Sequence, residues 1–377
     1  MVRLTTRSQL VDLPHRILEG AARAGIKLGE EDSSGVYFHV DQSTLFSQVN
    51  EHFGDKIEIM DTKEALETYP WLEDFRWKLI DKNQDEYTRQ VEERYSGGYF
   101  MRILPGASVT FPLQSCLLMT RRNSEQRVHN LIIAEKGSTS QILTTCVQHI
   151  DTLQATHLGV SEIYVKKGAK LNFTMVHHWG EDTKVRPRSA ALIEDGGEFI
   201  SNYICLTPVK DMQMLPAAYC NGEDSRALFN NILYVQEGSH MDIGARAELN
   251  GKGSKAELNT RAITKGNSKL TVRGTIVGNN HECKGHLECR GLVLDDNSVL
   301  EAIPILRAIK KGADLTHEAA VGKLSEHEIT YLMSRRMKQD DAVGALIRGF
   351  MDVSIMGLSK SISEKIEKII DAVAEAS

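Results

Sequence analysis

Residues 281–323 hold the densest group of metal-binding side chains in this chain. They are Cys283, His286, Glu288, Cys289, His317 and Glu318. Thiolate, imidazole and carboxylate are the usual soft, borderline and hard ligands of transition metals in proteins. If consecutive strands stack on one another, these side chains meet at one rim of the stack. We therefore expect this rim to be the working part of the protein, with the rest of the chain building the surface that holds it.

Length and composition place the chain among water-soluble globular proteins. It has 377 residues, a length that fits one elongated domain or two ordinary ones. Of these residues, 41% are hydrophobic and 6% are aromatic. The net charge of −6 disfavours a nucleic-acid partner. No apolar run reaches the roughly 18 residues of a membrane span, and the first residues lack a secretory h-region. The six scattered cysteines do not suggest a disulfide framework, so we expect a cytoplasmic location without membrane contact.

A recurring turn punctuates short β-branched runs between residues 97 and 322. Its central Gly or Asn positions are 106, 137, 168, 196, 238, 253, 266, 297 and 312, at separations close to multiples of about 14 to 15 residues. Turn residues that tolerate positive φ at a fixed interval are typical of a stacked coil. Between turns, polar and apolar residues alternate, as in 170–175. The pattern favours a mainly β protein with a parallel β-helix over 96–322. A large antiparallel sandwich is the alternative.

The two ends of the chain have different patterns. Residues 1–95 look mixed α/β, with a helix that becomes regular at Pro14, a hairpin-like piece at Gly35–Val40 and a solvated helical run at Lys63–Arg94. Residues 323–377 predict a helical domain. Its expected helices are Ile329–Met337 after a capping box at Ser325, Ala342–Met356, and Ser363–Ala376. Such a domain closes the last rung of a solenoid and offers a docking surface for a partner.

Strand geometry limits how the metal-binding residues can meet. Side chains alternate along a strand, so Cys283 and Cys289 share one face while His286 and Glu288 point the other way. His317 and Glu318 diverge as well unless the strand bulges or ends there. The full set therefore cannot face one point within one subunit, and a dimer interface is the arrangement that would unite it.

Three segments near the C-terminus have a distinctive sequence: Thr316–Lys323 (THEAAVGK), Glu328–Arg335 (EITYLMSR) and Asp340–Phe350. They resemble the C-terminal signature of the SufB/SufD family, the scaffold subunits of the SUF iron–sulfur cluster assembly machinery. Tyr95–Gly98 and Met175–Trp179 match weaker family segments in the right order. The resemblance extends from about residue 96 to the C-terminus. It implies a right-handed parallel β-helix flanked by helices, paired with a second subunit through the β-helix and bound through its C-terminal helices to a SufC-type ABC ATPase.

The resemblance also assigns roles to residues. Cys289 lies 28 residues before His317, the same distance at which the family's cluster-building cysteine precedes its His–Glu pair. The resemblance therefore implies that Cys289, His317 and Glu318 are the ligands of a transient cluster, which we expect to be of the [4Fe-4S] type. Mixed ligands suit a cluster that must be released. Cys146 matches a cysteine proposed to accept sulfur. Cys283 and Glu288 are further candidate ligands, while nothing in the sequence indicates a flavin.

The family features are mixed, since the Cys289, His317 and Glu318 set is SufB-like whereas AVGK after it is SufD-like. A homodimer supplying both sets of ligands explains the mixture. The chain has no GxxxxGK[ST] motif, so it is expected to be a non-enzymatic scaffold whose ATPase is the partner. The alternatives are a structural SufD-like subunit that needs a second scaffold chain, and a polysaccharide-acting β-helix enzyme.

Simpler roles compete with these assignments. Cys289 and Cys146 can be buried core thiols, the commonest fate of a free cysteine. His317 and Glu318 can simply form hydrogen bonds at the rim. We expect Cys116, Cys205 and Cys220 to be core residues, and His177-His178 to be packing residues because adjacent side chains point to opposite faces of a strand.

Overall fold

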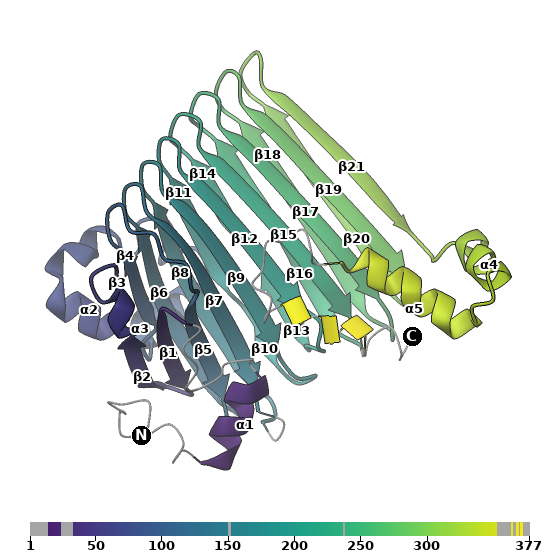
Figure 1. The fold of residues 1–377 in the computed structure, drawn as a ribbon, viewed down its shortest axis with the longest axis horizontal. Coiled ribbons are helices and arrows are strands. Elements are labelled where there is room, and N and C mark those ends of the chain that lie inside the picture. The colour runs from purple at the N-terminus through teal and green to yellow at the C-terminus, as the bar shows by residue number, and fades with distance from the viewer. Residues whose placement is uncertain are drawn as a thin grey trace.

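The chain winds into a parallel β-solenoid whose strands alternate between two facing sheets (Figure 1). The computed structural model describes residues 14–23, 33–149, 152–236, 238–352, 363–364, 367–368 and 370–371. The predicted mainly β fold with a parallel β-helix is confirmed, and the antiparallel sandwich is not what forms. Antiparallel pairing in the named sheets occurs at the N-terminal end, between β1 and β2 and between β3 and β4.

The first sheet carries the strands that matter most for the site. In spatial order they are β2 (Ser43–Val49), β1 (Gly35–Val40), β5 (Leu113–Met119), β7 (Thr139–Gln148), β9 (Lys170–His178), β12 (Glu198–Cys205), β15 (Arg226–Val235), β17 (Lys255–Thr264), β19 (Lys284–Val293) and β21 (Asp314–Gly322). From β1 to β21 every neighbouring pair is parallel. The stack therefore ends at β21, the last strand of the first sheet.

The second sheet faces the first across the solenoid interior. Its strands are β3 (Ile57–Asp61), β4 (Tyr99–Ile103), β6 (Glu125–Ala134), β8 (Thr156–Val165), β10 (Lys184–Val185), β11 (Arg188–Ile193), β13 (Asp211–Met214), β14 (Ala217–Cys220), β16 (His240–Leu249), β18 (Lys269–Gly278) and β20 (Val299–Ala308). β20 pairs with β18 and ends this sheet beside β21.

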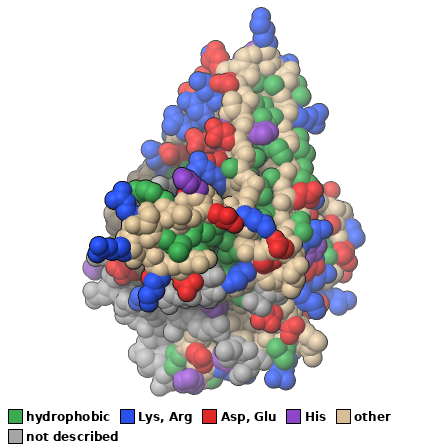
Figure 2. Space-filling model, turned by 90° about the vertical axis from the view of Figure 1, so that its right-hand side faces the viewer, with side chains coloured by type: hydrophobic (Ala, Val, Ile, Leu, Met, Phe, Trp, Pro, Cys, Tyr) green, Lys and Arg blue, Asp and Glu red, His purple; other side chains and the backbone are tan. Residues whose placement is uncertain are grey.

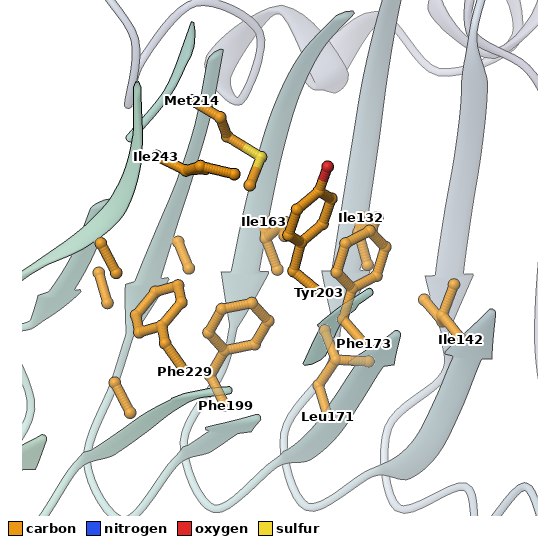
Figure 3. Packing of buried hydrophobic residues seen from close by; sticks show 14 of the residues in the cluster. Ile132, Ile142, Ile163, Leu171, Phe173, Phe199, Tyr203, Met214, Phe229 and Ile243 are labelled. Carbon is orange, nitrogen blue, oxygen red and sulfur yellow. The ribbon is translucent and has the colours of Figure 1, made fainter. Parts of the chain in front are cut away.

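The turns and the interior explain why this sequence coils. Eight predicted turn centres are glycines with positive φ: Gly106, Gly137, Gly168, Gly196, Gly238, Gly253, Gly266 and Gly312. That conformation costs glycine little, so each rung can turn back tightly. Inside, inward side chains of successive rungs pack against one another, as Phe173, Phe199 and Phe229 of the neighbouring strands β9, β12 and β15 do in Figure 3. The rings of Phe199 and Phe229 meet edge to face at 6.0 Å between centroids.

The N-terminal region packs onto the solenoid. Its helical elements are α1 (His15–Arg23), η2 (Glu51–Phe53), α2 (Thr62–Thr68), η3 (Pro70–Asp74) and α3 (Glu86–Arg94). The run predicted to be solvated instead buries Leu72 and Val91 against outward residues of the second sheet. The buried carboxylate of Glu162 on β8 accepts hydrogen bonds from the backbone N–H groups of four consecutive residues, 77–80. Because β1 and β3 also join the sheets, this region is continuous with the solenoid.

Two C-terminal helices follow the last strand. The side chain of Ser325 caps α4 (Glu326–Ser334) by accepting from the Glu328 N–H, as the capping box predicts. α5 (Gln339–Phe350) packs Ile347 against the outer face of the first sheet, beside Ile204 and Ile232. The predicted helix over 363–376 lies largely outside the described residues. None of the described helices has the length and apolar character needed to span a membrane.

Candidate functional site

Strands β19 and β21 place the predicted ligands at the C-terminal end of the solenoid. They run parallel in a register that pairs Leu287 with His317, Glu288 with Glu318 and Cys289 with Ala319. Leu287 and Cys289 are buried members of the interior cluster. Because paired residues of a parallel ladder point to the same face, His317 and Ala319 take the inner side as well. Cys289 and His317 are therefore diagonal neighbours on one face.

Glu318 lies on the opposite face. It pairs with Glu288, whose carboxylate forms an ion pair with the Nε of Arg290. His286 is on this outer face too, and its Nδ1 lies 2.8 Å from the Oγ1 of Thr316. The predicted ligands thus separate into a sulfur–imidazole pair inside and a carboxylate–imidazole set outside, as strand alternation requires. In the described part of the chain, no three His, Cys, Asp or Glu side chains are arranged to hold a metal ion.

The Cys289 thiol is almost completely buried although it lies one strand from the end of the sheet. Burial, with a smaller contribution from the Glu288 carboxylate, raises its pKa to about 11. The thiol borders an interior cavity of about 10 Å³, lined also by Thr260, Asn231 and Pro304. That volume holds at most one water molecule. A cluster at Cys289 therefore needs space that the closed interior of one chain does not provide.

A larger hollow of about 820 Å³ lies along the same strands. Its lining includes residues of both faces, namely Cys289, Ala319, Glu288, Arg290, Glu318, Lys323 and, from the end of α5, Phe350. The charged groups of both signs make this groove polar along the strands, while Phe350 makes one wall apolar. The end of α5 therefore borders the strands that carry the predicted ligands.

Cys283 does not join Cys289. It lies just before β19, and the six residue steps from Cys283 to Cys289 span roughly 20 Å of extended strand. Its thiol lies 3.0 Å from the carbonyl oxygen of Asn280, which accepts its hydrogen bond. Cys283 is fully buried near the turn end of the rung. The geometry of the single chain separates this candidate ligand from the others.

Cys146 occupies the inner face of β7, toward the other end of the solenoid. Five strand spacings separate β7 from β19, which amounts to roughly 24 Å. Burial raises the pKa of the Cys146 thiol well above the ordinary cysteine range. The structure therefore keeps Cys146 and Cys289 far apart. Cys116, Cys205 and Cys220 are buried, which confirms that they are core residues.

The exposed ends of both sheets are features that residue types alone did not reveal. Among the described strands, none pairs with β21 beyond β19 or with β20 beyond β18. The exposed large hydrophobic residues there include Val299, Ile305 and Val321. Figure 2 looks onto this end and shows hydrophobic side chains along the strands, flanked by charged ones. A search for apolar residues at the last turns of the repeat would have found this signal.

Comparison with known proteins places these features in a family context. A family model described as SUF system FeS cluster assembly, SufBD core domain, matches residues 117–350. An iron–sulfur cluster assembly SufBD family protein of Archaeoglobus fulgidus is 45% identical over 354 residues, 94% of each chain. A SufBD family protein of Methanothermobacter thermautotrophicus is 41% identical, covering 96% of this chain and 88% of its own. SufB of Bacillus subtilis is 25% identical, with 97% and 80% covered.

Proposed function

Because the chain belongs to the SufBD family of iron–sulfur cluster assembly proteins, we propose that it is a scaffold on which a cluster is built between two copies of the chain. The observation that carries this proposal is the position of Cys289 and His317 as diagonal neighbours on one face at the open end of the solenoid. In this role the protein accepts iron and sulfur, holds the nascent cluster and releases it. Cluster and iron are cargo rather than resident cofactors.

A homodimer supports this role in two ways. A twofold axis at the open end would bring two Cys289 and two His317 side chains together, which matches the four protein ligands that a [4Fe-4S] cluster takes. It would also cover the apolar residues exposed on the last strands. Glu318 faces away from Cys289 in the single chain, so it remains a predicted ligand that needs β21 to rearrange.

Backbone parity favours β21 as the pairing edge. The Asp314 N–H donates to the Cys283 carbonyl oxygen, so the backbone groups of Asp314 point toward β19. Because the backbone groups of successive residues point to opposite sides of a strand, the N–H and C=O groups of residues 315, 317, 319 and 321 point to the free edge. On β20 the same parity places Pro304 at the free edge, since the Val299 N–H bonds the neighbouring strand. Proline removes a donor there and obstructs strand addition. The edge of β21 has no such block.

The C-terminal helices suit a partner ATPase. α4 buries none of its residues and exposes Tyr331 and Met333. α5 contacts the first sheet, and its Phe350 lines the groove beside Glu288 and Glu318. A partner that moves these helices would therefore act on the strands that carry the ligands. We propose an ABC-type ATPase as that partner, because the chain has no phosphate-binding loop of its own.

The test is anaerobic reconstitution with ferrous iron and sulfide, followed by absorption and Mössbauer spectroscopy. We expect a cluster on the wild type and none on Cys289→Ala. Cys205→Ala is the matched control, because Cys205 is also a buried thiol of the first sheet but lies on β12, three strands from β19. An equal cluster on wild type and Cys289→Ala would contradict the assignment. An intact dimer without any cluster would instead favour a structural subunit that needs a second scaffold chain.

A further inference from the structure

Thr260 is the direct neighbour of Cys289 on the buried side of the first sheet. The two residues pair in register on β17 and β19, and Asn231 on β15 pairs with Thr260 in the same row. Paired residues of parallel strands point to one face and lie about 4.8 Å apart, so the three side chains form one row inside the solenoid. None of the three residues is more than 6% exposed. A hydrogen bond within this row is therefore shielded from water.

The hydrogen bond in this row has a direction. The Nδ2 of Asn231 donates to the Oγ1 of Thr260 at 3.0 Å, so the amide holds the hydroxyl oxygen in place. A threonine hydroxyl also has a proton of its own to donate. Among the described residues, no acceptor takes that proton from Thr260. The next side chain along the row is Cys289, whose sulfur can accept it.

The other inward-facing residues beside the thiol are largely apolar. The cavity of about 10 Å³ that Cys289 borders is lined on its inner side by Asn231, Thr260 and residues such as Leu258 and Leu287. A sulfur that carries negative charge in such surroundings needs a hydrogen-bond donor, because burying a charge without a partner is costly. The Thr260 hydroxyl is placed on the neighbouring strand to be that donor.

We propose that Thr260 is a positioning residue for Cys289, with a hydroxyl that donates to the Cys289 sulfur once that sulfur binds iron. The cavity beside the thiol leaves the Cys289 side chain space to turn between rotamers and meet the hydroxyl. Asn231 acts through Thr260 by holding its oxygen. The inference rests on the proposed function, in which Cys289 holds the cluster, and names residues that set how firmly the cluster is held.

A hydroxyl donor changes the properties of an iron-bound thiolate without adding a bond to iron. The reduction potential of an iron–sulfur cluster depends on hydrogen bonds to its sulfur atoms. Reduction adds negative charge, which a donor stabilises, so the Thr260 hydroxyl should raise the potential. Groups that orient a metal ligand also contribute to affinity, and their loss typically costs about 10- to 100-fold. The scaffold thus gains a firmer hold while the number of protein ligands stays low.

The test compares Thr260→Val with Thr260→Ser after anaerobic reconstitution of the full chain with ferrous iron and sulfide. Valine keeps the branched shape without the hydroxyl, whereas serine keeps the hydroxyl. We expect Thr260→Val to lower the midpoint potential in a redox titration followed by absorption, and to weaken binding of ferrous iron alone about tenfold. Thr260→Ser should stay close to wild type in both measurements. Asn231→Leu should change both in the same direction as valine, but less.

Thr264→Val is the matched control. Thr264 is a fully buried, inward-facing residue of the same strand, and its hydroxyl donates to the carbonyl oxygen of Leu292. This variant should change neither the potential nor the affinity. Melting temperatures show whether each variant is folded, and Thr260→Ala takes the place of valine if valine prevents folding.

Three outcomes would overturn the inference while leaving the proposed function intact. They are equal potentials and affinities in wild type and Thr260→Val, a serine variant as impaired as the valine variant, and an equal effect of Thr264→Val. The last two would mean that packing, and not the hydroxyl, sets the properties of the cluster. Absence of any cluster on the wild type would instead overturn the proposed function, and this inference with it.

Discussion

Cys289 and His317 lie diagonally across the paired strands β19 and β21 on the inner face of the solenoid, whereas the direct neighbour of His317, Glu318, faces outward. Because adjacent residues of a strand point to opposite faces, His317 and not Glu318 lies on the same face as the Cys289 thiol. This geometry distinguishes His317 from the outer-face histidine, His286, which bonds Thr316 instead. In the proposed dimer, the second chain would supply the remaining ligands.

The face of each histidine predicts the effect of its removal. We expect His317→Ala to lower the yield of reconstituted cluster at least tenfold, because it removes an inner-face ligand. His286→Ala is the matched control, because His286 lies one residue before Leu287, the residue paired with His317, and its imidazole is on the outer face. Cluster content is measured by iron and sulfide analysis and by absorption. A cluster that survives His317→Ala and is lost in His286→Ala would place the site outside the solenoid.

The raised pKa of Cys289 predicts how iron binding depends on pH. Iron binds the thiolate, so below a thiol pKa of about 11 each bound Cys289 releases a proton. Affinity for ferrous iron should therefore rise about tenfold per pH unit for each thiol bound, between pH 6.5 and 8.5. Anaerobic iron titrations at several pH values measure this slope. A flat profile would show that Cys289 is not a ligand of the first iron.

The free edge of β21 predicts a variant that separates pairing from folding. Ala319 directs its backbone N–H away from β19, so Ala319→Pro removes a donor only at the free edge. We expect this variant to be monomeric in analytical ultracentrifugation, with its melting temperature measured separately to show that the fold persists. Pro304 occupies the equivalent kind of position on β20, which indicates that proline is compatible with such an edge. A folded dimeric Ala319→Pro protein would argue against pairing through β21.

The buried carboxylate of Glu162 predicts a large loss of stability. It accepts from four consecutive backbone N–H groups and contacts the Nε2 of His129 at 2.9 Å. Glu162→Gln replaces charge-assisted hydrogen bonds by weaker ones, and we expect a loss of about 2–4 kcal/mol in the free energy of unfolding in urea. Glu194→Gln, at a part-exposed ion pair with Lys166, should cost less than about 1 kcal/mol. Equal effects would mean that the backbone contacts to Glu162 contribute little.

Local patterns in the sequence determined much of this protein. Glycines at fixed intervals, with alternation between them, predict the solenoid because turn conformation and strand parity are properties of neighbouring residues. The same parity predicts that Cys289 and Glu288 point to opposite faces. The spacing of Cys289 and His317 along the chain indicates that the two residues lie on successive strands of one sheet. Ser325 marks the start of the helix that follows.

Tertiary structure decided what depends on residues distant along the chain. The register that sets His317 beside Leu287 rather than beside Cys289 comes from how rungs stack, which no local pattern encodes. The packing of the helical run 63–94 also depends on distant residues. Its polar pattern predicts a solvated helix, whereas in the structure it packs against the second sheet and its backbone binds the Glu162 carboxylate. The burial of Cys146 likewise appears only once strand β7 is stacked between β5 and β9, because a side chain's surroundings are set by its neighbours in space.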